Sequence, residues 1–452
     1  IEGCLDMTNC VDEANAVGVV GLGGHASVFT VANGGVLRVG EYTYDGAGLG
    51  AMAVNTDYWT LNNGRLEITK AENGTFGNGL TVAAGGGTVV VENAASTMTI
   101  TADGTHYIQL NGTLTIAGAG SMTTGNDNVF RGTGRLVKDG SGTLTLANSS
   151  SFTGGVELKG GTLIVSNASG MGTNKNLSVT GNAAIGGMSS AFQNMSFAAG
   201  VNLNVSAVDD NAGLTLTNSV FLLNGGVTLT GNVAAAANSN NVLDISGFES
   251  VANGSILLTV NGTLTMNTGS TFSVIGKDVG ADEFAYGSVV DNRVVYNVRT
   301  GISTLIWGGA SAEWSAPGSW QGGVGFQTGD IALFDGSGAA DQTVTISSSV
   351  MAKRIVVSGE ANYTFAGSGS LGGPSMLEKS GTGTWTISNT NALAESFTVI
   401  NGGSLVLQAQ HALGTGGSVV INRGGMLRTA LAESVTTGGL NGQDVLINGG
   451  TL

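Results

Sequence analysis

The sequence predicts an all-β solenoid, in which the chain winds through stacked turns of roughly 20–29 residues. One observation is a short phrase, Gly-x-Leu, that returns along the chain and ends at Leu405, Leu427 and Leu452, at intervals of 22 and 25 residues. A second is a longer repeat, because the pattern of residues 134–165 returns at residues 375–407. The third is composition, with 77 glycines, only 2 prolines and 10% charged residues among 452.

Within each unit, apolar residues alternate with hydroxyl residues, as in Leu144-Thr145-Leu146 and Leu114-Thr115-Ile116. This period of two is typical of a strand with one buried face. Glycine, asparagine and aspartate between the strands provide the backbone conformations of tight corners. Proline is scarce because it would remove a ladder N–H from a continuous sheet. One turn cannot bury its own apolar face, so the repeat predicts that each turn stacks on the last.

Two segments break this rhythm and define the predicted organisation. Residues 1–16 form an N-terminal segment, and residues 276–309 form an irregular insertion between solenoids at 17–275 and 310–452. Inside the insertion, residues 288–298 (SVVDNRVVYNV) predict a hairpin with Asp291-Asn292 at its turn, and a boundary is expected near Gly301. The sequence stops in mid-repeat, so the natural chain is expected to continue past Leu452.

The formal charge of −15 and the absence of any basic cluster argue against nucleic-acid binding and against an anionic membrane surface. Mean hydropathy is +0.23, which argues against disorder. No apolar run approaches the ~18 residues of a membrane span. We therefore expect neither a nucleic-acid partner nor a direct membrane span in this chain.

The N-terminal segment contains both cysteines, Cys4 and Cys10, and does not begin with methionine, which suggests a processed or trimmed N-terminus. Two cysteines without a nearby histidine favour a local disulfide over a metal site. A disulfide would place the protein in an oxidising, extracytoplasmic compartment.

No motif predicts a catalytic, cofactor-binding or metal site. The acidic pairs Asp209-Asp210, Asp282-Glu283 and Asp12-Glu13 would point to opposite faces of a strand, which favours loop positions. Acids distant in sequence could still meet on neighbouring turns. Residues 367–372 fit GxGxxG by letters, but no helix pattern follows.

The three histidines are isolated from other candidate catalytic or metal-binding residues in the sequence, and we expect them to lie in surface turns. They are His25, His106 and His411.

Three of the five tryptophans, Trp307, Trp314 and Trp320, lie within 14 residues of one another. Exposed rings here could form a platform that stacks on sugars. Alternatively, the rings cap or plug the solenoid where it restarts, and the surrounding glycines favour this packing.

The repeated motif resembles the autotransporter-associated β-strand repeat of secreted bacterial surface proteins. The resemblance is carried by Leu136-Val-Lys138-Asp-Gly-Ser-Gly142-Thr-Leu144 with Gly160-Gly-Thr-Leu163, and by Leu377-Glu-Lys379-Ser-Gly-Thr-Gly383-Thr-Trp385. It implies a right-handed parallel β-helix that is exported across the cell envelope. Passengers of this kind include adhesins, enzymes and plain stalks, so it implies no single activity.

These observations predict a non-enzymatic, extracellular structural protein of a bacterial surface. It would self-assemble into fibres by end-to-end stacking, or act as an adhesin stalk that meets host or surface glycans, for example through residues 276–286. The alternative is a carbohydrate-active β-helix enzyme, which would need a cleft lined by acids and aromatics from adjacent turns.

Overall fold

A computed structural model describes residues 4–7, 28–39, 58–69, 73–76, 79–102, 107–338, 341–430, 440 and 442–452. It divides into two compact units, Ile1–Leu214 with Val227–Asn232, and Thr215–Gly226 with Val233–Leu452. Strand β23 (Leu214–Leu216) lies at the boundary in sequence. The described residues contain no α-helix, only the short 3-10 turns η2 (Ser189–Ala191), η3 (Pro317–Ser319) and η4 (Gln321–Gly323).

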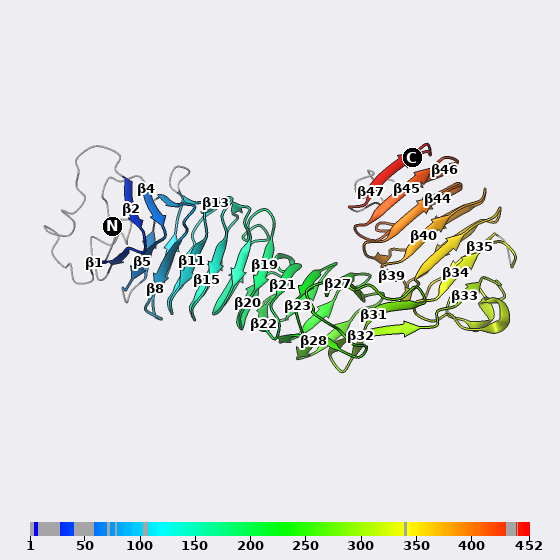
Figure 1. Ribbon diagram of the computed structural model, residues 1–452, viewed down its shortest axis with the longest axis horizontal. Coiled ribbons are helices and arrows are strands. Elements are labelled where there is room, and N and C mark those ends of the chain that lie inside the picture. The colour runs from blue at the N-terminus through cyan, green and yellow to red at the C-terminus, as the bar shows by residue number, and fades with distance from the viewer. Residues whose placement is uncertain are drawn as a thin grey trace. The chain divides into compact units, whose positions relative to one another are not determined.

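The first unit is built from three parallel sheets, whose strands lie side by side in the blue to green part of Figure 1. The first sheet contains, in order, β1 (Cys4–Met7), β3 (Val36–Val39), β5 (Gly64–Ile68), β8 (Gly87–Val91), β11 (Leu114–Ala117), β14 (Leu136–Lys138), β17 (Val156–Leu158), β19 (Asn176–Val179) and β21 (Asn194–Phe197). The second contains β2 (Val28–Ala32), β4 (Tyr58–Asn62), β7 (Gly79–Val82), β10 (Ile108–Leu110), β13 (Phe130–Gly132) and β16 (Ser151–Phe152). The third contains β6 (Gly74–Phe76), β9 (Thr97–Ile100), β12 (Ser121–Thr124), β15 (Thr143–Leu146), β18 (Thr162–Val165), β20 (Ala183–Gly187), β22 (Asn202–Val208) and β25 (Val227–Thr230).

Each strand pairs in parallel with the equivalent strand one turn later, which confirms the predicted parallel β-solenoid. Leu114 pairs with Leu136, 22 residues on, and Leu136 pairs with Val156, 20 residues on. The spacing falls to 18 residues between Leu177 and Met195, in a turn that contains the short turn η2 and no third strand.

The predicted alternation decides which side chains enter the interior. In β15 the leucines are buried and the threonines are half-buried on the outer face. Leu144, Leu163 and Ile185 follow one another in register, and all are fully buried. Columns of identical or similar side chains therefore fill the interior, one per turn, as a stacked parallel ladder requires.

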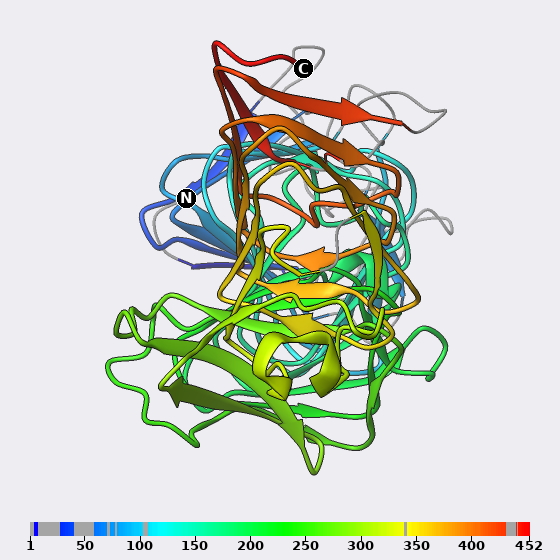
Figure 2. The ribbon, with the colours of Figure 1, turned by 90° about the vertical axis from the view of Figure 1, so that its right-hand side faces the viewer.

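The second unit contains two sets of parallel strands. One set comprises β24 (Val220–Leu223), β27 (Asn240–Asp244) and β30 (Thr271–Ile275), with β26 (Val233–Ala235) beside β29 (Leu264–Met266). The other set has three sheets. They contain β33 (Thr304–Ile306), β34 (Ile331–Phe334), β37 (Arg354–Val357), β40 (Met376–Lys379), β43 (Phe397–Ile400), β45 (Ser418–Asn422) and β47 (Asp444–Asn448); β35 (Gln342–Thr345), β38 (Tyr363–Ala366), β41 (Thr384–Ile387), β44 (Gly403–Leu407) and β46 (Gly425–Thr429); and β36 (Val350–Met351), β39 (Leu371–Gly373) and β42 (Ala392–Leu393). In Figure 2 the orange to red turns surround a common interior.

An antiparallel hairpin separates the two sets. Strand β31 (Glu283–Val290) pairs with β32 (Arg293–Thr300), and β32 pairs with β28 (Ile256–Asn261). The turn residues Asp291 and Asn292 both have positive φ, as a two-residue hairpin with the right-handed twist of its strands requires. The hairpin predicted at this turn is thus confirmed, and its strands are longer than predicted. The predicted domain boundaries, including the one near Gly301, remain predictions.

Two side chains fix the hairpin to the strands that follow it. Arg299 donates to the Thr328 carbonyl at 2.7 Å and forms an ion pair with buried Asp330 at 2.9 Å. Lys353 Nζ donates to the carbonyl oxygens of Ala281 and Glu283. Asp330 also accepts from the backbone N–H of Ser303, so its charge is fully partnered.

We expect Leu163→Asp to destabilise the solenoid strongly and Ile164→Asp to leave its stability nearly unchanged. Leu163 is fully buried in the interior column, whereas Ile164 lies on the outer face of the same strand. An unpaired carboxylate in an apolar interior costs several kcal/mol, which corresponds to a fall of roughly 10 °C or more in the melting temperature. Thermal unfolding followed by circular dichroism measures this, and equal melting temperatures for the two variants would contradict the stacking.

Candidate functional site: a lysine corner in each repeat

A lysine points into the interior column at the corner after β14. Lys138 pairs in register with Ile116 and Leu158, and only 1% of its surface is exposed. Its Nζ donates to the carbonyl oxygens of Asp139 at 2.6 Å and Gly140 at 3.0 Å. A third acceptor, Gly160 O at 3.5 Å, lies one turn further along the chain. The ammonium therefore joins the corners of two successive turns.

The second repeat builds the same arrangement. Lys379, also 1% exposed, lies between Val357 and Ile400 in its column. Its Nζ donates to the carbonyl oxygen of Ser380 and, at 3.5 Å, to that of Gly402. We call each arrangement a lysine corner: Lys138 with Asp139, Gly140, Gly160 and Gly161, and Lys379 with Ser380, Gly381, Gly402 and Gly403.

A glycine in the left-handed region makes room for each ammonium. Gly161 has φ +69° and Gly403 has φ +66°. A β-carbon at Gly161 would lie 2.7 Å from Lys138 Nζ, and one at Gly403 would lie 2.8 Å from Lys379 Nζ. Both would also collide with carbonyl oxygens of the preceding turn. Each corner therefore requires a glycine at this position, about one turn after its lysine in sequence.

Burial lowers the pKa of Lys138 to about 8, against its ordinary 10.5, although the nearby charge of Asp139 acts in the opposite direction. Burial alone lowers the pKa of Lys379, again to about 8. Removing an ammonium from water disfavours its charged form. Near neutral pH each corner therefore holds a charge at a cost in free energy, offset by the carbonyl oxygens around it. This arrangement can tether turns; both side chains are buried, so it does not present a nucleophile to solvent.

The three predicted tryptophans come together, but in the interior. Trp307, Trp314 and Trp320 are each 1% exposed, with ring centroids 5.2 Å apart for Trp307–Trp320 and for Trp314–Trp320. They pack around Phe334 at the first turn of the strands from β33 onward. The indole N–H of Trp307 donates to Gln342 at 2.9 Å. The rings plug the interior, and the alternative of an open platform for sugars is wrong because no ring face is exposed.

Other residues singled out by sequence occupy turns or fall outside the description. Asp209 and Asp210 have positive φ after β22, and Asp209 accepts from the backbone N–H of Ser189. Glu283 accepts from the N–H of Gly280 at 2.7 Å. His411 has a positive φ, and its carbonyl accepts from Gly414.

The remaining predictions near the N-terminus are not tested. Cys10, His25, His106 and the pair Asp12-Glu13 lie outside the described residues, as does the side chain of Cys4. The predicted disulfide therefore stays a prediction.

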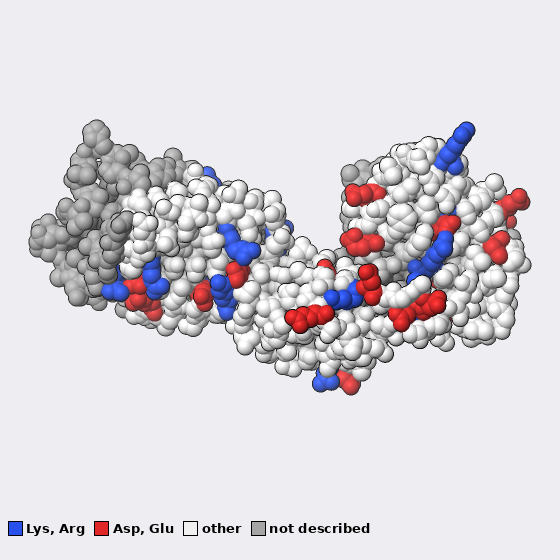
Figure 3. Space-filling model, viewed as in Figure 1, with Lys and Arg blue, Asp and Glu red and all other residues white. Residues whose placement is uncertain are grey.

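Charged side chains form small clusters on the face drawn in Figure 3, many of them of mixed sign, and no basic patch is visible on that face. In the first unit, Glu67 pairs with Arg38 and Arg65, and Glu157 pairs with Arg135. In the second, Arg354 pairs with Glu378. In each of these pairs, the arginine and the carboxylate lie on the same turn or on neighbouring turns.

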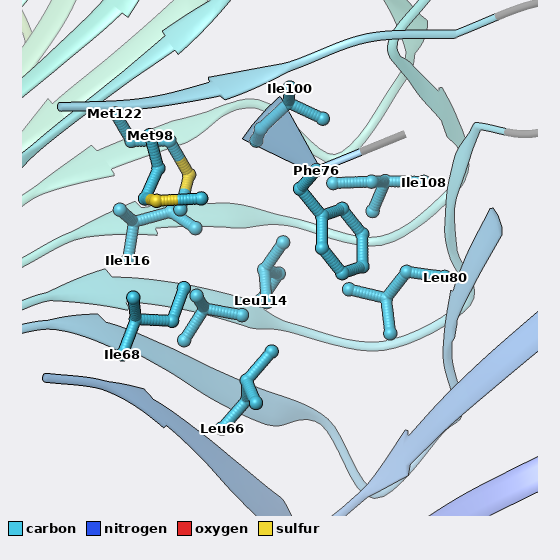
Figure 4. Close-up of a pocket in the computed structure, with 11 residues that line it drawn as sticks. Leu66, Ile68, Phe76, Leu80, Met98, Ile100, Ile108, Leu114, Ile116 and Met122 are labelled. Atoms are coloured by element: carbon cyan, nitrogen blue, oxygen red, sulfur yellow. The ribbon is translucent and has the colours of Figure 1, made fainter. Parts of the chain in front are cut away.

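An internal cavity in the first unit is too small for a ligand. Its volume is about 10 Å³, and its lining is entirely apolar, with Phe76, Met98 and Met122 among the side chains shown in Figure 4. A water molecule needs about this volume and several polar partners. This cavity is a packing gap of the interior.

Within the described parts of the chain, no three His, Cys, Asp or Glu side chains gather in a way that could hold a metal ion. The same described parts contain no helix with the length and apolar character of a membrane span.

The model of the passenger-associated-transport-repeat family matches residues 136–165 and again residues 377–407. These two matches, together with the parallel β-solenoid, confirm the resemblance of the repeat to that of autotransporter passengers. Each matched segment contains one complete lysine corner, and this repeat implies export to the cell surface or extracellular space. Comparison with curated proteins and with solved structures gave no match.

We expect Gly161→Ala to destabilise the first unit by several kcal/mol, because the methyl group would collide with Lys138 and with the carbonyl oxygens at a positive φ. Gly160→Ala is the matched control, since a β-carbon there makes ordinary contacts, the nearest at 3.5 Å. Chemical denaturation of both variants measures the difference. Equal midpoints would show that the glycine does not form the corner.

The lowered lysine pKa predicts a pH-dependent stability. Below about pH 8 the folded and unfolded chains both carry the ammonium, so the burial cost is present in full. Between pH 8 and 10.5 the folded chain loses the proton first, and the free energy of unfolding rises by up to about 3 kcal/mol per lysine.

Denaturation at about pH 7.5 and pH 10 tests this. The rise in stability should be smaller in Lys138→Met than in the wild type, and unchanged in Lys159→Met, whose side chain is 48% exposed. An identical rise in Lys138→Met and the wild type would contradict the assignment.

Proposed function

We propose that the chain is a non-enzymatic, extracellular structural protein of a bacterial surface, a β-solenoid that self-assembles into fibres or acts as an adhesin stalk. The observation that supports this most strongly is that side chains bridge one turn to the next in both units. Asn148 Nδ2 donates to Thr124 O at 3.0 Å, and Ser149 Oγ donates to Asp127 at 2.7 Å. These bonds span 22 or 24 residues, which is one turn.

In the second unit such bridges form ladders. Asn362 donates to Asp341 and accepts from the N–H of Thr384 one turn later. Asn422 donates to Asn401 at 2.8 Å, and Asn448 donates to Asn422 at 2.9 Å. Stacked amides of this kind add to backbone pairing in repetitive β-structures. Together with the lysine corners, they favour a mechanical role, in which each turn stiffens its neighbours.

The same geometry supports the proposal of self-association. A strand at the end of a parallel stack has unpaired backbone groups, which can pair with the end of another copy. A fibre would extend the ladders by adding copies end to end. A stalk would use the same turns as a monomer and carry a binding surface.

Size-exclusion chromatography and negative-stain electron microscopy of the purified protein test this proposal, with reducing-sugar assays on a panel of polysaccharides. Regular filaments would support fibre assembly, and isolated particles without cleavage would support the stalk. Catalytic release of sugar ends, lost when acidic residues of an exposed turn are replaced, would overturn the proposal in favour of the enzyme.

A further inference from the structure

The outer face of the third sheet in the first unit carries two columns of hydroxyl side chains. In β9, β12 and β15, hydroxyl residues alternate with buried Met98, Met122 and Leu144. We call the eight outward hydroxyl residues of five successive strands the hydroxyl face; the remaining outward residue, Ile164, is apolar. They are Thr97, Ser121, Thr143 and Thr162 in one column, and Thr75, Thr99, Thr123 and Thr145 in the other.

The columns form a regular lattice. Thr75 pairs in register with Thr99, which pairs with Thr123, which pairs with Thr145. Neighbouring strands lie about 4.8 Å apart, and alternate residues of one strand about 6.7 Å apart. Along the stack, each column therefore presents one hydroxyl per turn. Across the stack, the two columns lie side by side.

This face carries no charge. Strands β6, β9, β12, β15 and β18 contain no Asp, Glu, Lys or Arg. The nearest charged residues in sequence lie outside the strands, at Glu72, Asp103, Asp127, Asp139 and Lys159. The first sheet of the same unit, by contrast, carries Arg38 and Glu157. The absence of charge excludes recognition by ion pairs and suits an uncharged ligand.

The hydroxyl groups are also unused by the protein. Within the described residues, none of the eight side-chain oxygens has a hydrogen-bond partner. Elsewhere in the unit, Ser149 donates to Asp127 and Thr180 donates to Glu157. Each hydroxyl of the face therefore has one donor and two acceptor positions available.

We propose that the hydroxyl face binds a neutral, extended polysaccharide that lies along the stack with successive sugars on successive turns. Sugar hydroxyls would exchange hydrogen bonds with the threonine and serine hydroxyls, and threonine methyl groups would contact the C–H faces of the rings. Each contact is weak, so affinity comes from their number along the chain. The inference rests on the proposed extracellular function and names the ligand class of an adhesive stalk.

Binding to cellulose, chitin and a linear β-1,3-glucan, measured by pull-down, and to soluble oligosaccharides of increasing length, measured by calorimetry, tests the proposal. We expect binding to at least one polymer, with affinity rising with length until the oligomer spans the face. The variant Thr99→Val, Thr123→Val, Thr145→Val keeps shape and β-propensity and should bind at least tenfold more weakly.

The matched control replaces outward threonines of the other two sheets, as Thr81→Val, Thr88→Val, Thr115→Val, and should bind as the wild type. Circular dichroism confirms that both variants fold. Equal binding by the two variants, or no binding to any polymer, would overturn the proposal.

Two further outcomes would lead to different conclusions about the hydroxyl face. In the first, the wild type binds no polysaccharide but inhibits ice recrystallisation, and the inhibition is lost in the first variant. This result would show that the hydroxyl face binds ice, and it would overturn the proposal. Filaments or isolated particles that bind no polymer would leave the proposed structural function intact while removing this inference.

Discussion

The parallel backbone ladder between successive turns is the constraint on which the rest of this structure depends. Because the described strands of the parallel sheets pair with the strand one turn later, each position forms a column, and a column accepts only residues that suit their neighbours above and below. Interior columns are filled by residues such as Leu144 and Leu163, and outer columns by hydroxyl residues. The sequence repeats because each turn has nearly the same surroundings as the turn before it.

The lysine corners are the main departure from that pattern. A cation in an interior column costs free energy, as the lowered pKa of Lys138 and Lys379 shows. Carbonyl oxygens from two turns and a glycine with positive φ surround each ammonium and offset this cost. Among the described residues, one corner is found in each unit, within a segment matched by the repeat family. A buried lysine is destabilising unless the carbonyl oxygens and the glycine of its corner surround it. The lysine therefore favours one register between neighbouring turns, since a slipped turn would leave the ammonium without acceptors.

Much of the fold could be predicted from sequence because it is periodic. Alternation in Leu144-Thr145-Leu146 gave the strand and its buried face, and Asp291-Asn292 gave the hairpin turn. Periodicity could not say where single residues of unusual chemistry point. Lys138 follows two apolar residues and looks like an exposed end of a strand, although its recurrence at Lys379, in a chain with few lysines, was a usable signal. The tryptophans were ambiguous because a flat ring suits either a surface or a plug, and only the packing around Phe334 decides between them.

Cross-linking of paired positions tests the parallel register most directly. In a chain with Cys4→Ser and Cys10→Ser, the pair Thr123→Cys and Thr145→Cys occupies directly opposed positions on neighbouring strands. Such positions lie within the range of a disulfide. The pair Thr123→Cys and Thr143→Cys is displaced by one alternate residue. Mass spectrometry after mild oxidation should find the first disulfide far in excess of the second. Equal yields, or an excess of the displaced pair, would contradict the register on which the fold, the lysine corners and the hydroxyl face all rest.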